Sequence, residues 1–358
     1  MPKLFEPVSF RSVTARNRIA VAPMCQYSAT DGLGDDWHIQ NLGAKAAGGA
    51  GIVFAEATHV SAVGRITPGC LGLWNSAHLH LMSRLAAIIS KCGAVPGVQL
   101  AHAGRKASAE VPWRGGKGIP IASGGWQTIG ASAIPFSDST TTPTAMSLAD
   151  IADVVSQFTA STRMARHAGM KVIELHAAHG YLVHSFLSPI SNTRNDQYGG
   201  DLAGRARLLL DLVDAVRREW PDDLPLFVRL SCVDWMDGGL TLPDAVAIAK
   251  MLAATGKVDL IDCSSGGIAA VGPHIPSLHP GYQVPFAETI RRSAGIATGA
   301  LGLITSAQHA AEIIANDRAD LIFVARAVLA DPGWPLRVAK ELGAPLELLP
   351  QYQRATLS

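Results

Sequence analysis

The chain has 358 residues, a formal net charge of +1 at pH 7 and a hydrophobic fraction of 48%. These values are typical of a compact soluble protein with a large core. They argue against nucleic acid as a partner, because binding to a phosphate backbone needs a basic excess or stripe and the lysines and arginines are scattered. We therefore expect a small molecule as the partner.

The amino-terminal segment and the cysteines indicate the compartment. The opening MPKLFEPVSFRS lacks an apolar core followed by a small-residue cleavage site. No uninterrupted apolar stretch reaches the roughly 18 residues of a membrane span, so we expect a cytoplasmic protein with no membrane partner. The cysteines form no CxxC pair, so they predict neither a disulfide framework nor a zinc site.

Short apolar runs alternate with helix-compatible segments along the chain. The runs cover residues 18–24, 51–57, 95–100, 172–178, 225–231, 260–266, 296–302 and 321–328. The helical segments include residues 77–92, 148–168, 202–220, 243–255 and 306–316. This alternation predicts one (β/α)8 barrel domain over residues 1–358. A doubly wound open sheet is the competing fold, but its GxGxxG motif is absent.

Residues 101–147 are too many for an ordinary βα loop. They contain Trp113, Trp126 and several glycines and prolines, so we expect an inserted lid. In a barrel this lid would cover the C-terminal mouth, where active sites are built.

Polar and reactive side chains fall near the carboxyl ends of the first five predicted strands. They are Met24 and Cys25, Glu56 and Ala57, Gln99 and His102, His176 and His179, and Arg229. Because parallel barrel strands end on the same face, these side chains converge on one mouth. Their convergence predicts a functional site there.

The stretch VIELHAAHGYLVHSFLSP brings His176, His179 and Tyr181 close together after a strand. The HxxH spacing differs from HExxH and no cysteine follows at ligand spacing, which disfavours a metal site; buried core histidines are a second alternative. Neutral histidines that donate to a carbonyl oxygen would polarise it. Tyr181, with an ordinary pKa of about 10, would serve nearby as a proton donor.

The last two predicted strands carry a phosphate-binding pattern. Gly299 and Gly302 precede a helix start at Thr305, and Arg326 follows the eighth run. Backbone N–H groups and a guanidinium at these units suit a phosphate, although plain turn glycines and a surface arginine are the alternative. With Gln99 and Arg229 at the mouth, the pattern fits flavin mononucleotide (FMN), whereas a sugar phosphate fits the phosphate end alone.

These residues carry a resemblance to the old yellow enzyme family of FMN-dependent ene-reductases, and within it to the bacterial branch of thermophilic-type enzymes and xenobiotic reductases. The resemblance extends over essentially the whole chain. It rests on LFEP, RNRIAVAPMCQY, DWH, GAGIVFAEATHV, GRITPGCLGLW, VQLAHAGRKAS, IELHAAHGYLVHSFLSP, VRLS, GALGLITS and DLIFVARAVLADPGWP.

The resemblance implies a (β/α)8 barrel with noncovalently bound FMN that takes hydride from NADPH or NADH. It implies an isoalloxazine surrounded by Pro23, Met24, Cys25, Ala57, Gln99 and Arg229, and a phosphate held by Gly302, Ala325 and Arg326. It assigns the substrate carbonyl oxygen to His176 and His179, proton donation to Tyr181 and part of the pocket wall to Tyr27. Cys25, which marks the bacterial branch, would tune the flavin's potential, with a buried structural thiol as the alternative.

The resemblance further implies ping-pong reduction of enones and related activated alkenes by a homodimer or a homotetramer built as a dimer of dimers. The C-terminal tail, residues 344–358, would lie at a subunit interface, with Arg354 reaching the neighbouring site. Two departures stand out: Ala325 replaces a common glycine, so a positive φ is not expected there, and the aromatic residue that tends to follow Arg354 is missing. A metal-dependent barrel hydrolase or lyase using the HxxH pair and a noncatalytic flavin redox sensor are the alternative functions.

Overall fold

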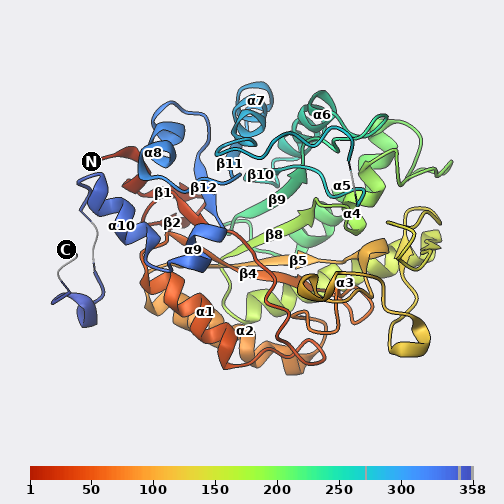
Figure 1. Ribbon diagram of the computed structural model, residues 1–358, viewed down its shortest axis with the longest axis horizontal. Coiled ribbons are helices and arrows are strands. Elements are labelled where there is room, and N and C mark those ends of the chain that lie inside the picture. The colour runs from red at the N-terminus through yellow and green to blue at the C-terminus, as the bar shows by residue number, and fades with distance from the viewer. Residues whose placement is uncertain (271, 346–347, 356–358) are drawn as a thin grey trace.

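Eight parallel strands of the chain close into a barrel in the order β10-β11-β12-β3-β4-β5-β8-β9 (Figure 1). The computed structural model describes residues 1–355 except 271, 346 and 347. The barrel strands are β3 (Ile19–Val21), β4 (Ile52–His59), β5 (Val95–Ala101), β8 (Val172–Ala177), β9 (Leu226–Ser231), β10 (Leu260–Ser264), β11 (Ala297–Ala300) and β12 (Leu321–Val324). Each coincides with one of the eight apolar runs, so the predicted (β/α)8 fold is confirmed.

Helices surround the barrel. Five match the predicted segments: α2 (Ser76–Lys91), α3 (Leu148–His167), α5 (Leu202–Glu219), α6 (Leu242–Ala254) and α8 (Ala307–Ala315). The sequence pattern did not predict α1 (Asp36–Ala47), α4 (Leu182–Leu187), α7 (Val284–Ala294), α9 (Arg326–Ala330) and α10 (Trp334–Glu341). The eighth predicted run, residues 321–328, extends beyond its strand, which ends at Val324; α9 begins at Arg326. Ala325 lies between them, with a φ of −117° and a ψ of −88° that fit neither a strand nor a helix.

The barrel interior is apolar toward the amino ends of its strands. Phe54, Phe227 and Phe323 pack there, with ring centroids of Phe54 and Phe323 5.9 Å apart. An added Cβ on Gly299 would approach the Phe323 ring to 2.3 Å, so glycine is required for this packing. The polar residues of the strands are therefore concentrated toward the carboxyl ends, at the opposite mouth.

A two-stranded hairpin, β1 (Val8–Phe10) and β2 (Val13–Ala15), lies at the amino end of the barrel. Its tip is held by Arg11, whose guanidinium donates to the Asp259 carboxylate at 2.6 Å just before β10. Phe10 contacts Phe227 inside the barrel with ring centroids 5.1 Å apart. Packed side chains therefore close the amino end of the barrel, and in this fold residues at that end contribute to stability.

The segment between β5 and α3 contains three short 3-10 helices, η2 (Gly104–Lys106), η3 (Pro112–Arg114) and η4 (Ile121–Ser123), and a small sheet of β6 (Ile129–Gly130) and β7 (Thr144–Ala145). Arg105 donates hydrogen bonds to the carbonyl oxygens of Ile134, Pro135 and Ile268, which ties this segment to the loop after β10. Among residues 1–270, 272–345 and 348–355, no helix is long and apolar enough to cross a bilayer.

Candidate active site

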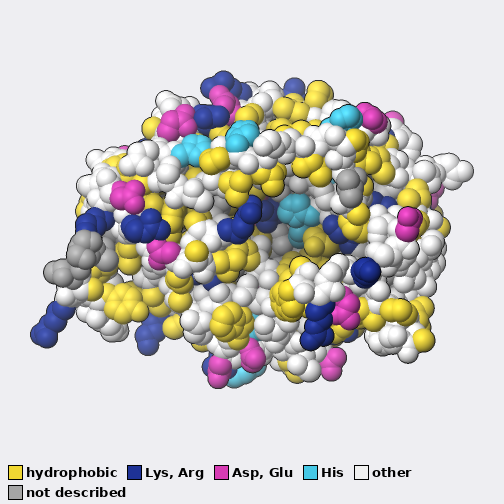
Figure 2. All heavy atoms as spheres, viewed as in Figure 1, with side chains coloured by type: hydrophobic (Ala, Val, Ile, Leu, Met, Phe, Trp, Pro, Cys, Tyr) yellow, Lys and Arg dark blue, Asp and Glu magenta, His cyan; other side chains and the backbone are white. Residues whose placement is uncertain are grey.

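The face shown in Figure 2 is hollowed, with histidine and basic side chains along the wall of the hollow. Two backbone corners at the carboxyl ends of strands supply the side chains predicted for the site. We call residues 24–27, which follow β3, the β3 corner, and residues 179–181, which follow β8, the β8 corner. Their side chains meet in one small cluster, where Cys25, Tyr27 and Tyr181 pack against Ile66, Cys70, Ala103 and Ala107.

Three aromatic rings gather at the β8 corner. The ring of His176, the penultimate residue of β8, lies 5.1 Å from that of His179 and 4.9 Å from that of Tyr181, centroid to centroid. His179 has a φ of +60°, and its N–H donates to the Ser231 hydroxyl at 2.9 Å. This left-handed backbone turns His179 back toward His176 instead of continuing the strand.

Both histidines are neutral at physiological pH. Burial, with the nearby Arg229 charge as the next cause, holds the pKa of His176 and of His179 well below the usual value. The N–H of Ala178 donates to His176 Nδ1 at 3.3 Å, so the ring proton of His176 lies on Nε2. The Ser264 hydroxyl lies 2.7 Å from His179 Nε2 and 3.4 Å from Gln283 Oε1, and it can donate to either; a bond donated to Nε2 would place the proton of the His179 ring on Nδ1.

Tyr181 is held in its protonated form. Burial, followed by the neighbouring Cys25 and Tyr27, raises the pKa of Tyr181 well above its usual value. Lys106, from η2, lies with Nζ 5.0 Å from the Tyr181 ring centroid and donates to the carbonyl oxygens of His179 and Gly267 at 2.8 and 3.1 Å. Sequence reasoning missed Lys106, because a single lysine in GRKAS has no spacing that marks it.

The β3 corner is held by a buried carboxylate. A bulge interrupts the pairing of β4 with β5 at Glu56, and Ala57 resumes it opposite Gln99. Glu56 accepts the N–H of Gln26 through Oε2, and its Oε1 lies 3.2 Å from His38 Nε2 on α1. The Cys25 thiol faces Cys70; the contact with Cys70, then burial, raises the pKa of Cys25 well above its usual value.

A buried polar layer lies below the two corners. Gln99 on β5 donates to Glu174 on β8 at 2.7 Å. Arg229 on β9 lies opposite Asp262 on β10, with Nε 3.1 Å from Oδ2. Burial, then the neighbouring Asp262, raises the pKa of Glu174. The acidic partners Glu174 and Asp262 were not predicted, since only the strand register brings them beside Gln99 and Arg229.

A cavity at the ends of β11 and β12 contains the predicted phosphate-binding residues. Its lining includes Gly302, Ala325 and Arg326, together with Arg229 from the polar layer. Gly302 has a φ of +111°, and an added Cβ would come within 3.2 Å of Gln283 N. Ala325 has a negative φ, as the sequence predicted. Tyr282 and Gln283, which also line this cavity, carry no motif that could have marked them.

The structure thus brings most of the predicted site residues together. Pro23 and Met24 follow β3 after Ala22, and both are half-buried. Arg354 is exposed in the C-terminal segment, after η5 (Pro350–Tyr352), and Figure 1 shows that end at the outer edge of the molecule. Its entry into a neighbouring site stays a prediction, and residues 346, 347 and 356–358 of the predicted interface tail lie outside the described part. Among the residues that the structure describes, no three or more metal-ligating side chains cluster so that they could hold a metal ion.

A closed parallel barrel whose C-terminal mouth holds neutral histidines, a protonated tyrosine and a cavity lined by Arg229 and Arg326 defines the class of this protein. The family model described as "NADH:flavin oxidoreductase / NADH oxidase family" matches residues 3–344. An NADPH dehydrogenase of Geobacillus sp. (strain WCH70) is 47% identical over 353 residues, which are 98% of either chain. The chain belongs to this flavin oxidoreductase family, and it is an oxidoreductase of the old yellow enzyme type.

Solved structures of similar proteins share this fold. The old yellow enzyme homologue from Zymomonas mobilis matches with a TM-score of 0.77 at 25% identity, over 97% of this chain and 94% of that one. A 2-naphthoyl-CoA reductase matches with a TM-score of 0.87 at 26% identity, over 96% of this chain. The chain spans about half of that reductase, 52% of its length, whereas it spans nearly all of the curated relatives.

Proposed function

We propose that this protein is an NADPH-dependent ene-reductase with noncovalently bound FMN, which reduces the C=C bond of α,β-unsaturated carbonyl compounds. The observation that carries the proposal is the set of three rings at the β8 corner, two of them neutral imidazoles and one a protonated phenol. The name of the curated relatives, NADPH dehydrogenase, supports NADPH over NADH as the hydride donor.

The residues present fit FMN. The cavity lined by Gly302, Ala325 and Arg326 suits its phosphate, and it continues to Arg229, one of the residues proposed for the ring. The others are Pro23, Met24, Cys25, Ala57 and Gln99. Bound FMN would accept hydride from the nicotinamide and donate it to the β-carbon of the substrate.

The protein's own groups would supply polarisation and a proton. His176 would donate from Nε2, and His179 from Nδ1, to the substrate's carbonyl oxygen, which draws electron density from the β-carbon. Tyr181 would then give its phenolic proton to the α-carbon. The Arg229 guanidinium would stabilise negative charge on the ring, and Tyr27 would line the pocket.

One pocket would serve both substrates in turn, which predicts ping-pong kinetics. Nicotinamide and enone would bind in the same pocket one after the other, so the nicotinamide donor needs no separate dinucleotide-binding fold. We further propose that the protein is cytoplasmic and forms a homodimer or homotetramer, in which Arg354 of one subunit completes the neighbouring site.

An anaerobic spectral titration tests the proposal. The purified protein should show oxidised-flavin absorbance that bleaches when NADPH is added and returns when 2-cyclohexenone follows. A colourless protein that cannot be reconstituted with FMN would contradict the cofactor assignment and return attention to a metal-dependent hydrolase. Bound FMN that NADPH bleaches but no activated alkene restores would instead indicate a redox sensor.

A further inference from the structure

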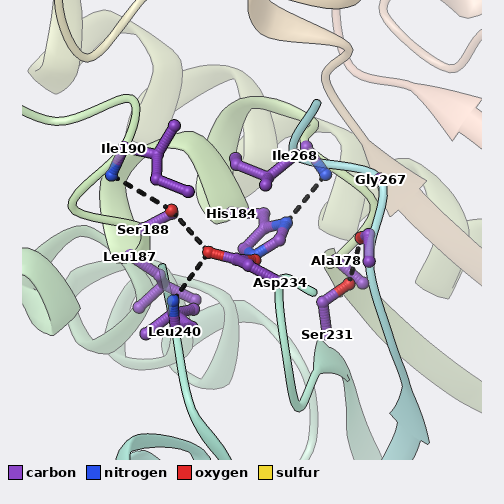
Figure 3. Close-up of polar contacts among 12 residues, drawn as sticks. Ala178, His184, Leu187, Ser188, Ile190, Ser231, Asp234, Leu240, Gly267 and Ile268 are labelled. Carbon is purple, nitrogen blue, oxygen red and sulfur yellow. Dashed lines mark hydrogen bonds and ion pairs between the residues drawn. The ribbon is translucent and has the colours of Figure 1, made fainter. Parts of the chain in front are cut away.

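A histidine and an aspartate without a role in the proposed chemistry lie buried behind the β8 corner. His184 is on α4, which begins directly after Tyr181, and Asp234 follows β9. Their side chains are fully buried, and His184 Nε2 lies 2.9 Å from Asp234 Oδ1 (Figure 3). A buried carboxylate costs free energy unless its partners are well placed, so the pair calls for an explanation.

The pair connects directly to the backbone of the corner. The N–H of Gly180, between His179 and Tyr181, donates to His184 Nδ1 at 2.7 Å. Because Nδ1 is an acceptor, the ring proton lies on Nε2, the ring atom that is 2.9 Å from Asp234 Oδ1. Asp234 Oδ2 in turn accepts from the Ser188 hydroxyl at 2.6 Å and from the N–H of Leu240 at 2.8 Å. These contacts are mutually consistent with only one placement of the histidine proton.

The corner they support has an unusual backbone. Gly180 has a φ of +74°, next to His179 with its φ of +60°. An added Cβ on Gly180 would approach the carbonyl oxygen of Gly267 to 2.1 Å, and one on Gly267 would approach His179 Cα to 2.6 Å. Consecutive left-handed residues in close contact with a second loop persist only where the surroundings hold them.

We propose that His184 and Asp234 are positioning residues for Tyr181: through the Gly180 N–H they hold the β8 corner so that the tyrosine can deliver its proton. This inference rests on the proposed ene-reductase function. Tyr181 is the residue between Gly180 and α4, so a shift of the Gly180 peptide displaces its phenol. A misplaced phenol slows protonation of the substrate, whereas hydride transfer from NADPH to the flavin needs no proton from it.

The substitution Asp234→Asn tests this with almost no change of volume. An amide nitrogen facing His184 Nε2 would donate to it and move the ring proton to Nδ1, where it opposes the Gly180 N–H. With the amide turned over, its NH2 group would instead oppose the N–H of Leu240. A second variant, His184→Asn, places an acceptor oxygen near the position of Nδ1 and loses only the Asp234 contact.

A matched control lies at the opposite end of the barrel. Asp259 accepts the N–H of Leu226 at 2.8 Å, much as Asp234 accepts that of Leu240, but it contacts neither corner. Asp259→Asn is therefore the same chemical change with a comparable structural cost. It should leave the ratio of the two half-reactions as it is in the wild-type protein.

The experiment measures both half-reactions of the FMN-loaded proteins by anaerobic stopped flow. For Asp234→Asn we expect oxidation by 2-cyclohexenone to slow at least about tenfold and reduction by NADPH to stay within about twofold. His184→Asn should fall between Asp234→Asn and wild type. Added to Tyr181→Phe, Asp234→Asn should cause almost no further loss, because the proton donor it positions is already gone.

Three results would overturn the positioning role. They are equal slowing of both half-reactions, full additivity with Tyr181→Phe, and an Asp259→Asn variant that shifts the ratio as strongly. Failure of the proposed function has a different signature: the reduced wild-type protein itself would not be reoxidised by any enone. If Asp234→Asn does not fold, His184→Asn is measured alone and combined with Tyr181→Phe, and the same three results decide the question.

Discussion

The β3 corner and the β8 corner are built from the same parts in opposite order. Each is supported by a histidine at the third position of the helix that follows, His38 on α1 and His184 on α4, and each histidine pairs with a buried carboxylate. At the β3 corner the carboxylate of Glu56 touches the backbone and His38 stands behind it. At the β8 corner the histidine touches the backbone and Asp234 stands behind.

The order decides how much negative charge each corner receives. Burial raises the pKa of Glu56, and its charge is among the causes that raise the pKa of the Cys25 thiol. Burial also acts on Asp234, but His184, Ser188 and Leu240 more than compensate and lower its pKa. The β8 corner is thus insulated from its carboxylate, which suits neutral proton donors, whereas the β3 corner carries a charge beside a thiol.

The largest expected effect separates the tyrosines of the two corners. Tyr181→Phe should slow oxidation by the enone about 100-fold or more and leave reduction by NADPH nearly unchanged, because only the former needs the phenolic proton. Tyr27→Phe, which removes the same hydroxyl at the β3 corner, should change either step only slightly. Stopped-flow kinetics of both half-reactions gives the comparison, and equal losses in the two steps for Tyr181→Phe would refute its role.

The structure shows which parts of this comparison the sequence could supply. The eight strands were visible because buried parallel strands are apolar on both faces. His176, His179 and Tyr181 were visible because they follow one strand together. Helix α1 was missed since Gly43 and its polar residues weaken the apolar periodicity, and α7 follows a proline-rich loop.

The partners of the site residues could not be predicted, because they come from distant segments. His184 and Asp234 meet only when α4 packs against the loop after β9. Glu56 faces α1 because a bulge breaks the strand register, and no residue pattern announces that bulge. Sequence reasoning therefore located the groups proposed for chemistry and, apart from Glu56, missed the groups that hold them.

The next effect concerns stability and has a different size at each corner. Asp234→Asn should lower the free energy of unfolding by about 2–4 kcal/mol at pH 7, since it replaces a buried carboxylate that faces His184 and accepts from Ser188 and Leu240. Glu56→Gln should change it by less than about 1 kcal/mol, because the lost contact with His38 is offset by relief of a costly buried charge. Calorimetric unfolding of both FMN-loaded variants measures the difference.

The pH dependence of these two effects has opposite signs. The pKa of Asp234 is lowered from 3.8, so its stabilisation is present at neutral pH and is lost as the pH falls below about 4. The pKa of Glu56 is raised from 4.5, so ionisation of Glu56 destabilises the fold as the pH rises through its folded value. Two variants with the same loss at every pH would contradict the contrast between the corners.

A smaller effect probes the carbonyl-binding side of the β8 corner. His176→Ala should weaken binding of a phenolate ligand about 10- to 100-fold, because it removes one hydrogen bond to the charged phenolate oxygen. The flavin absorbance change on titration with p-hydroxybenzaldehyde gives the dissociation constant. His59→Ala is a useful comparison, since it removes a buried imidazole that has no proposed contact with the ligand. An equal loss of affinity in His59→Ala would show that the effect of His176→Ala does not come from carbonyl binding.

The smallest effect concerns Lys106, which faces the β8 corner from η2. Burial, then the charge of Arg105, lowers the pKa of Lys106 to about 7. Its protonated form should stabilise the tyrosinate that develops as Tyr181 gives up its proton, so reoxidation by the enone should slow as the pH rises through 7. Lys106→Met should be roughly tenfold slower than wild type at pH 6, equivalent to about 1.4 kcal/mol, and should lose this pH dependence.

The Lys106→Met variant separates the charge at Lys106 from other titrations in the site, which include Glu174 and Asp262, because burial raises the pKa of Glu174 to about 8 and that of Asp262 to about 6. The pKa values of His176 and His179 are held well below their usual value, and that of Tyr181 well above, so none of these groups changes its charge between pH 6 and 8. Lys117→Met, at an exposed position of the same segment, is the control and should keep the wild-type profile. If the rate of reoxidation of Lys106→Met still changes near pH 7, the titration belongs to another group. The charge of Lys106 would then have no effect on proton donation at the β8 corner.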